Sequence, residues 1–238
     1  MVHNVLKKIC IITARGGSKR IPRKNIKEFY GKPILAYPIE VAFESRLFDE
    51  VMVSTDDQEI AEVAKKYSAK IPFFRSEENS NDIIGTDSVL IEVLNEYKSR
   101  GIEFDYACCI YPTASLLTVE DLRRAWELLV SKNFDTVFSV LRYGSPIQRA
   151  LRLKEGGRVS MFHPENLMKR SQDLESAYYD AGQFYFFNVN RFLNKRRLWT
   201  DCSSVIVLDE MNAQDIDNEE DWALAEFKYK YRLFHKIK

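Results

Sequence analysis

Short runs rich in β-branched residues alternate with longer amphipathic segments, and this alternation restricts the fold more than any other feature of the chain. The first run, residues 8–13 (KICIIT), has an unbroken apolar centre, as expected for a strand that is buried on both faces. Further strands are predicted over residues 50–54, 70–74, 106–111, 136–141, 183–189 and 204–208. Helices are predicted over residues 33–44, 58–67, 86–100 and 119–131, and from Asn218 onward. This βαβα order predicts an α/β domain with a mostly parallel sheet flanked by helices.

The ends of several predicted helices carry residues typical of helix termini. Thr118 is a suitable N-cap for the helix over residues 119–131, with Asp121 three residues further on. Gly101 is expected to end the preceding helix. Asn218 precedes three acidic residues, which favour a helix N-terminus because they complement its dipole. These signals support the predicted helix boundaries.

The regular alternation stops after Arg142. Residues 143–180 are rich in Gly, Pro, Arg and Tyr and have weak periodicity, so we interpret them as an insertion that forms a small lobe with a hairpin. The chain has 238 residues, of which 45% are hydrophobic. Because a domain typically takes about 100–200 residues, residues 1–238 are interpreted as one large domain that contains this insertion.

Charge and hydropathy exclude several classes of protein. Thirty-five basic and 35 acidic residues cancel, so no net charge draws the chain to nucleic acid or to a membrane. No apolar run reaches the ~18–20 residues of a membrane span, and no secretion signal is recognisable. The four cysteines lack C-x-x-C spacing, and Cys108 and Cys109 are expected to be core thiols. We therefore expect a reduced, cytoplasmic protein.

The loop that follows the first strand, residues 14–25, is the most informative segment for function. It combines the adjacent glycines Gly16 and Gly17 with five basic side chains, and it matches neither the Walker A nor the G-x-G-x-x-G pattern. Adjacent glycines permit a nest of backbone N–H groups that binds anions. A solvated basic turn is the alternative, but the position after a buried strand favours binding of a polyphosphate. The side chains suited to that ligand are Arg15, Ser18, Lys19 and Lys24.

A second candidate site is Asp215-Ile216-Asp217. Residues two apart lie on the same side of an extended segment, so both carboxylates would face one ligand. Mg²⁺ in proteins takes one or two carboxylates together with substrate phosphates, and this pattern therefore suggests a magnesium site. The alternative is an acidic approach to the last helix.

Other polar segments give weaker signals. Ser54-Thr55-Asp56-Asp57 follows the second strand and is interpreted as a helix N-cap rather than as part of the cleft. Tyr111 ends a strand on the expected ligand side. Arg149, Lys169 and Arg170, in the insertion, could hold an acidic substrate, although each alone is more often a surface charge.

Five stretches spread over nearly the whole chain are IITARGGSKRIPRKNI, GKPILAYPIEVA, FDEVMVSTDDQEIAEVA, YPTASLL and QDIDNEEDWALAE. In these stretches, and in their order, the chain resembles the CMP-sialic acid synthetases, the cytidylyltransferases that activate nine-carbon sialic-type acids. PIQRAL and YYDAGQFYFF are most similar to the pseudaminic acid branch. Thr13 stands where most relatives have Pro, and Phe186-Phe187 replace a more usual Tyr-Trp. Neither change touches a charged role, and only the second bears on the expected fine sugar specificity.

The resemblance implies a Rossmann-like fold of the nucleotide-diphospho-sugar transferase type, with the insertion used for dimerisation. It implies that Arg15, Gly16, Gly17, Ser18, Lys19, Lys24 and Asn25 bind the CTP phosphates, and that Arg75, Thr86 and Ser88 bind cytosine and ribose. It also implies that Asp215 and Asp217 bind Mg²⁺ and that Tyr111, Gln148, Arg149, Arg170 and Tyr185 bind the sugar acid. Arg15, Lys19, Asp215 and Asp217 are the implied catalytic residues.

The reaction that the resemblance implies converts CTP and a nonulosonic acid, with pseudaminic acid as the expected substrate, to the CMP-sugar and pyrophosphate. N-acetylneuraminic or legionaminic acid is the alternative substrate, and a non-catalytic nucleotide-binding module is the alternative of a different class. The paired carboxylates argue against that module, because binding a nucleotide rarely needs them. A homodimer is also implied, in which Arg170 of one subunit approaches the sugar site of the other.

Overall fold

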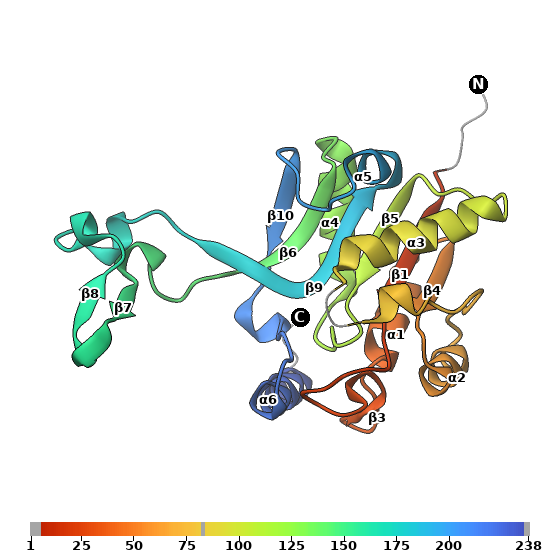
Figure 1. Ribbon diagram of the computed structural model, residues 1–238, viewed down its shortest axis with the longest axis horizontal. Coiled ribbons are helices and arrows are strands. Elements are labelled where there is room, and N and C mark those ends of the chain that lie inside the picture. The colour runs from red at the N-terminus through yellow and green to blue at the C-terminus, as the bar shows by residue number, and fades with distance from the viewer. Residues whose placement is uncertain (1–5, 82–83, 236–238) are drawn as a thin grey trace.

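The computed structural model describes residues 6–81 and 84–235, and its centre is a six-stranded sheet with the strand order β10-β6-β9-β5-β1-β4 (Figure 1). The strands are β1 (Lys8–Thr13), β4 (Glu50–Ser54), β5 (Tyr106–Ile110), β6 (Thr136–Arg142), β9 (Tyr178–Asn188) and β10 (Ser203–Val207). β9 runs antiparallel to both of its neighbours, and the other adjacent pairs are parallel. The prediction of a mostly parallel sheet is thus confirmed.

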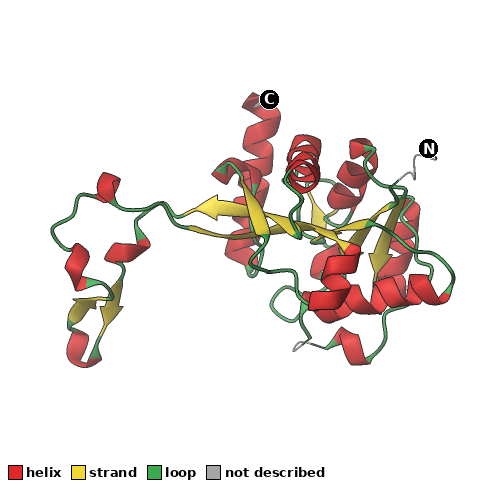
Figure 2. Ribbon diagram, turned by 90° about the horizontal axis from the view of Figure 1, so that it is seen from above, coloured by secondary structure: helices red, strands yellow, loops and turns green. Residues whose placement is uncertain are grey.

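Helices cover both faces of this sheet (Figure 2). They are α1 (Ala36–Ser45), α2 (Gln58–Lys66), α3 (Thr86–Ser99), α4 (Val119–Ser131), α5 (Val189–Lys195) and α6 (Glu219–His235). One core cluster joins α1, α2 and α4 to the sheet face that holds Cys10 and Cys108, and another joins α3 and α5 to the face that holds Ile11 and Cys109. Both cysteines of β5 are fully buried, so their assignment as core thiols is confirmed.

A third apolar cluster supports the segments that later form the site. It buries Ile21 of the basic loop, Ile216 of the segment before α6, and Trp222 of α6. Nearby, β2 (Glu28–Phe29) pairs with β3 (Lys32–Pro33), and Phe29 contacts Trp222 edge-on at 5.6 Å between ring centroids. This packing ties the loop after β1 to the beginning of α6, although almost 200 residues separate them in sequence.

A lobe projects from the body between β6 and β9 (Figure 1). It contains the antiparallel hairpin of β7 (Leu151–Leu153) and β8 (Val159–Met161). β9 begins at Tyr178 rather than at residue 183, because its first residues pair with the end of β6 before a register shift between Phe138 and Val140. The returning chain lies beside the strand that led to the lobe, and this direct return makes β9 antiparallel.

Two predicted elements were wrong or misplaced, and one helix was not predicted. Residues 70–74 do not form a strand: Lys70 makes a single parallel bridge to Met52, and Pro72, which lacks an N–H, follows two residues later. The first helix begins at Ala36 rather than at residue 33, because Pro33 belongs to β3. Val189 begins α5, a short helix that the sequence did not predict.

The predicted helix caps were correct. The side chain of Thr118 accepts a hydrogen bond from the Asp121 amide at 3.2 Å, and Asn218 Oδ1 accepts from the amides of Glu220 and Asp221. Gly101 follows α3 with φ of +75°. Within the described ranges, no helix is long and apolar enough to cross a membrane.

Candidate active site

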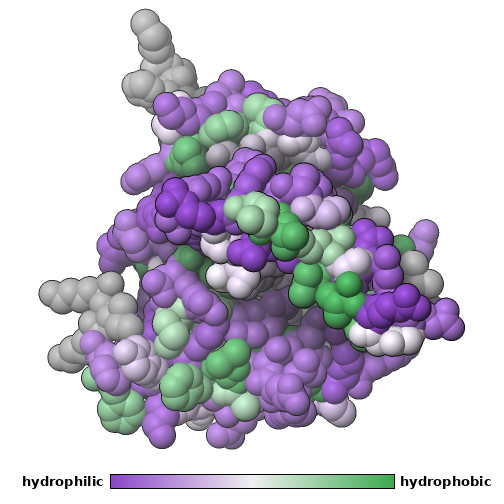
Figure 3. Space-filling view, turned by 90° about the vertical axis from the view of Figure 1, so that its left-hand side faces the viewer, coloured by the Kyte–Doolittle hydropathy of each residue, from purple (hydrophilic) through white to green (hydrophobic). Residues whose placement is uncertain are grey.

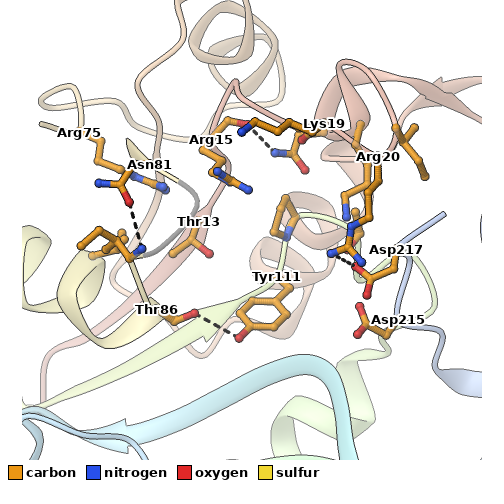
Figure 4. Close-up of a pocket in the computed structure, with 18 of the residues that line it drawn as sticks. Thr13, Arg15, Lys19, Arg20, Arg75, Asn81, Thr86, Tyr111, Asp215 and Asp217 are labelled. Atoms are coloured by element: carbon orange, nitrogen blue, oxygen red, sulfur yellow. Dashed lines mark hydrogen bonds and ion pairs between the residues drawn. The ribbon is translucent and has the colours of Figure 1, made fainter. Parts of the chain in front are cut away.

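A cavity of about 360 Å³ lies at the carboxyl ends of β1 and β5 (Figure 4). Open α/β sheets bind ligands at this edge because the loops that follow parallel strands meet there. Its lining includes residues from the basic loop, from the segment around Arg75 and the start of α3, from the end of β5, and from the Asp215–Asp217 segment. Segments far apart in the sequence thus converge on one cavity.

The predicted phosphate loop forms one wall of the cavity. Five of its predicted residues line it: Arg15, Ser18, Lys19, Lys24 and Asn25. Asn25 is buried, and its Nδ2 donates to the Arg15 carbonyl at 2.9 Å, which fixes the loop where it begins. Arg20 also lines the cavity, although the sequence analysis gave it no separate role. The loop therefore directs several cationic groups toward one space.

The glycine backbone of this loop does not form the predicted open nest. The Gly16 amide donates to Asp56 Oδ1 at 2.8 Å, and neither Gly16 nor Gly17 lines the cavity. Gly16 is needed for close packing, since a Cβ there would lie 2.7 Å from Asp57 Oδ2. Donors toward the cavity are consequently side chains rather than the amide of Gly16.

Asp57 connects the loop to helix α2. Its Oδ1 accepts from the Ile60 amide at 2.9 Å, so the predicted N-cap is confirmed. The same carboxylate pairs with the guanidinium of Arg23, whose backbone is left-handed with φ of 55°. The hydrogen bond from Arg23 lowers the pKa of Asp57 to about 2. The ion pair between Arg23 and Asp57 thereby fixes the path of the loop's backbone.

Asp215 and Asp217 form the opposite wall, and both side chains reach the cavity (Figure 4). Ile216 between them is fully buried in the third core cluster, so the two carboxylates share one side of the segment, as the spacing predicted. Arg20 pairs with Asp217 at 2.8 Å, and Lys24 Nζ donates to the Ile216 carbonyl at 2.5 Å. Burial and the charge of Asp217 raise the pKa of Asp215. The acidic segment thus contacts Arg20 and Lys24 of the basic loop directly.

The backbone of β9 brings Asp215 close to the sheet. Gly182 has φ of +60°, and a Cβ on it would lie 3.1 Å from Asp215 Cγ. Burial also raises the pKa of Asp180 nearby. Paired carboxylate oxygens next to cationic side chains are a donor set that suits Mg²⁺, because that ion commonly shares its ligands between protein and substrate phosphate. The residues present therefore fit the predicted ion.

The other end of the cavity is lined by Arg75, Asn79 and Thr86. Arg75 is buried, and its Nε and Nη2 donate to the side chain and the carbonyl of Ser54 at 3.0 and 2.6 Å. Burial lowers its pKa. Ser88 is exposed and does not line the cavity. Arg75 and Thr86 thus lie together as expected, and Ser88 does not join them.

Tyr111 connects this cavity with a second hollow of about 370 Å³. Its hydroxyl contacts Thr86 Oγ1 at 3.2 Å, and both residues line both spaces. Tyr185 and Trp199 line the hollow. The ring of Phe138 stacks on both of them, with ring centroids 5.4 Å from Tyr185 and 4.9 Å from Trp199. Two of the predicted sugar residues, Tyr111 and Tyr185, are therefore brought together.

The other three predicted sugar residues lie in the lobe, away from both spaces. Gln148 donates to the Glu175 carbonyl, Arg149 to Ser171, and Arg170 to the carboxylate of Asp173. None of the three lines either hollow of this chain. A single copy of the chain therefore does not place them at the site.

Sequence reasoning missed several lining residues. Asn79 lines the first cavity from the short 3-10 helix Glu78–Ser80, and Asn81 and Trp199 line the two spaces from irregular segments. No periodicity marks any of these positions. Arg20 had a usable signal, because it lies within the basic loop. Thr13 was noted only for its difference from relatives, yet as the last residue of β1 it borders the cavity.

Comparison with known proteins identifies the family. A family model described as cytidylyltransferase matches residues 9–221. The chain is 43% identical over 225 residues to a pseudaminic acid cytidylyltransferase of Campylobacter jejuni, and the match covers 94% of this chain and 97% of that protein. It is 31% identical to a CMP-N,N'-diacetyllegionaminic acid synthase of Legionella pneumophila, covering 92% and 94%.

A solved structure supports the fold. The structure of CMP:2-keto-3-deoxy-manno-octonic acid synthetase complexed with CTP matches with a TM-score of 0.68 at 14% identity, covering 95% of this chain and 99% of that one. At this identity the likeness concerns the fold alone, and it agrees with the predicted nucleotide-diphospho-sugar transferase type. The family match and the near full-length relative together show that this chain belongs to the cytidylyltransferases.

Proposed function

We propose that this protein transfers the cytidylyl group of CTP to pseudaminic acid, giving the CMP-sugar and pyrophosphate. The observation that carries the proposal is the cavity in which the basic loop faces Asp215 and Asp217. The 43% identity to a pseudaminic acid cytidylyltransferase supports the choice of substrate. Membership of a transferase family favours catalysis over a non-catalytic nucleotide-binding module.

In the proposed reaction, the anomeric hydroxyl oxygen of the sugar attacks the α-phosphorus of CTP. The bond from that phosphorus to the bridging oxygen of the β-phosphate breaks, pyrophosphate leaves, and the hydroxyl proton is released. Such a step depends mainly on the positions of the reactants and on neutralisation of charge. Arg15 and Lys19 stabilise the negative charge of the leaving group, and Ser18, Lys24 and Asn25 orient the phosphates.

Asp215 and Asp217 are the residues that would hold Mg²⁺. When bound, the ion supplies Lewis-acid stabilisation to the α-phosphate. The two carboxylates keep their place because Ile216 is buried behind them and Lys24 holds the carbonyl between them. Arg20, now paired with Asp217, is near enough to neutralise that carboxylate until a cation replaces it.

The nucleoside occupies the end of the cavity near Arg75. Ser54 holds two of the guanidinium nitrogens of Arg75, so the group is fixed when it meets the base. Thr86 at the start of α3 lies where the ribose passes toward the second hollow. Ser88 lies outside the cavity and has a lesser role in this proposal.

The sugar acid occupies the second hollow beside Tyr111 and Tyr185. The aromatic wall formed with Trp199 suits the apolar face and acyl substituents of such a sugar. Its carboxylate needs a cation, and we place Arg170 there from the lobe of a second copy, with Gln148 and Arg149 nearby. The buried free thiols of Cys10 and Cys108 suit a reducing compartment, and we propose the cytoplasm.

The test is pyrophosphate release from CTP with pseudaminic, legionaminic and N-acetylneuraminic acids in parallel. We expect pseudaminic acid to give the highest kcat/KM. Legionaminic and N-acetylneuraminic acids are the alternatives, since relatives named for these substrates also match at 31% and 34% identity. ATP, GTP and UTP serve as controls for the nucleotide. Turnover that prefers another sugar would correct the substrate, and no release with any of them would reject the function.

A further inference from the structure

The segment that carries Asp215 and Asp217 has no regular secondary structure, yet side chains bind its backbone at every carbonyl from residue 213 to residue 216. The bonds are Lys228 Nζ to Ala213 O (2.9 Å), Gln183 Nε2 to Gln214 O (3.2 Å), Gln214 Nε2 to Asp215 O (3.0 Å) and Lys24 Nζ to Ile216 O (2.5 Å). The donors come from α6, from β9, from the segment itself and from the phosphate loop. Three of the four donors that hold the backbone around the two carboxylates therefore lie outside the segment.

Lys228 is the most unusual of these donors. It is a basic residue on the inner side of α6, only 6% exposed, and Trp222 and Ala225 on the same side of the helix are apolar. A buried ammonium is costly unless it is hydrogen-bonded, and an apolar residue would pack there at lower cost. Burial lowers its pKa, while Glu210 and Asp209 oppose that shift. Packing of α6 alone does not explain a lysine at this position.

Both described hydrogen bonds of Lys228 reach the carboxylate segment. Besides the Ala213 carbonyl, Nζ donates to Gln214 Oε1 at 3.0 Å. The Nε2 of the same Gln214 amide then donates to the Asp215 carbonyl. The Lys228 ammonium thus holds the Ala213 carbonyl directly. It holds the Asp215 carbonyl indirectly, through the side-chain amide of Gln214.

We propose that Lys228 is a positioning residue for the Asp215–Asp217 pair. It does not line the cavity, so it acts through the segment and not on the nucleotide. By holding residues 213–215 it keeps the two carboxylates at a separation that binds one divalent cation. The inference rests on the proposed function for that cation, and it adds a residue of the last helix to the site.

The test measures affinity for Mn²⁺ alone by electron paramagnetic resonance, together with the Mg²⁺ concentration that gives half-maximal activity. Lys228→Met should weaken both by about 10–100-fold, the usual effect of losing a group that holds a metal ligand. Binding of CTP without metal should be unchanged, because Lys228 does not reach the cavity. Lys230→Met, on the exposed side of the same helix, is the matched control and should leave both quantities unchanged.

Circular dichroism first checks that Lys228→Met is folded. If it is not, Gln214→Ala decides the question, since it removes the amide between Lys228 and Asp215 at a half-buried position. That variant should weaken Mn²⁺ binding several-fold, and an unchanged affinity in whichever variant is folded would overturn the inference. Asp217→Asn distinguishes failure of the metal assignment from failure of the inference about Lys228. If Asp217→Asn also binds Mn²⁺ normally, both are rejected. If Asp217→Asn loses Mn²⁺ binding while the Lys228 or Gln214 variant keeps it, only the role of Lys228 is rejected.

Discussion

Lys24 lies between the two charged walls of the cavity. Its ammonium donates to the Ile216 carbonyl, and burial lowers its pKa while Asp217 and Asp215 oppose that change. It therefore both supports the carboxylate segment and faces the phosphate space. Lys19 is exposed on the cavity wall. At the scale of single residues, Lys19 is the clearer probe of phosphate binding.

Lys19→Ala should lower kcat/KM for CTP by about 10–100-fold, because a hydrogen bond from a charged donor to phosphate contributes about 1.5–3 kcal/mol. The melting temperature should change little, since an exposed side chain adds little to folding. Steady-state kinetics and thermal denaturation measure the two effects. Lys66→Ala on α2, exposed and away from the cavity, is the control. Unchanged CTP affinity and turnover would show that the loop is a solvated turn.

Asp57→Asn tests the ion pair that holds the loop. Asparagine still caps α2, so the change removes mainly the pairing with Arg23, and a loss of about 1–2 kcal/mol is expected at neutral pH for this partly exposed pair. The folded pKa of about 2 lies below the ordinary 3.8, so the stabilisation is present above pH 4 and is lost as pH falls toward 2. Urea denaturation at pH 7, 4 and 2.5 measures it. If the difference in free energy of unfolding between the variant and the wild type did not change with pH, the ion pair between Asp57 and Arg23 would not be its cause.

β9 has the largest influence on the site among the elements. It fills the middle of the sheet, contributes Tyr185 to the second hollow, and places Gln183 and Gly182 behind the carboxylate segment. Its left-handed glycine permits Asp215 to approach the sheet. The element thus connects the proposed sugar and metal sites.

Gly182→Ala should impair the site more than the fold. The positive φ costs an alanine about 1–2 kcal/mol, and its Cβ would press on Asp215, which must then move. We expect the Mg²⁺ concentration for half-maximal activity to rise by about tenfold, as for other groups that hold metal ligands. Gly144→Ala, where no atom lies within 4 Å of the added Cβ and φ is not positive, is the control. Equal Mg²⁺ dependence in the two variants would show that Asp215 tolerates displacement.

The whole molecule is asymmetric, with a compact body and a lobe that stands apart from it. Figure 3 shows apolar side chains scattered among hydrophilic ones on the side from which the lobe projects. The lobe residues Leu151, Val159 and Leu167 are each more than half exposed, as is Met168. Such a set on a small lobe favours an interface between two copies. In the proposed homodimer, each lobe supplies Arg170 to the site of its neighbour.

Mixing subunits tests this arrangement. Asp217→Asn and Arg170→Ala should each be inactive alone, but a mixed dimer contains one site with both residues intact. Random exchange should restore roughly a quarter of wild-type activity, because half of the dimers are mixed and one of their two sites works. Light scattering checks the mass and labelled subunits check exchange. A monomeric mass, or no recovery after proven exchange, would contradict the shared site.

Local patterns were enough to predict much of this protein. Apolar periodicity located β1, β4, β5 and β6, and the caps at Thr118, Asp57 and Asn218 were readable because they depend only on neighbouring residues. The spacing of Asp215 and Asp217 similarly predicted that both face one side. These features are local, so a single stretch of sequence determines them.

Tertiary structure decided what depends on distant segments. The Gly16 amide bonds Asp56 instead of remaining open, because β4 ends beside the loop. Residues 70–74 fail to form a strand because only Lys70 meets β4. The hollow beside Trp199 and the hold of Lys228 on the carboxylate segment arise where remote segments pack. Local sequence patterns were enough to show which residues carry charge and where most strands and helices form. Three-dimensional packing decided which charges meet, since hydrogen bonds across 15–192 positions leave no local pattern.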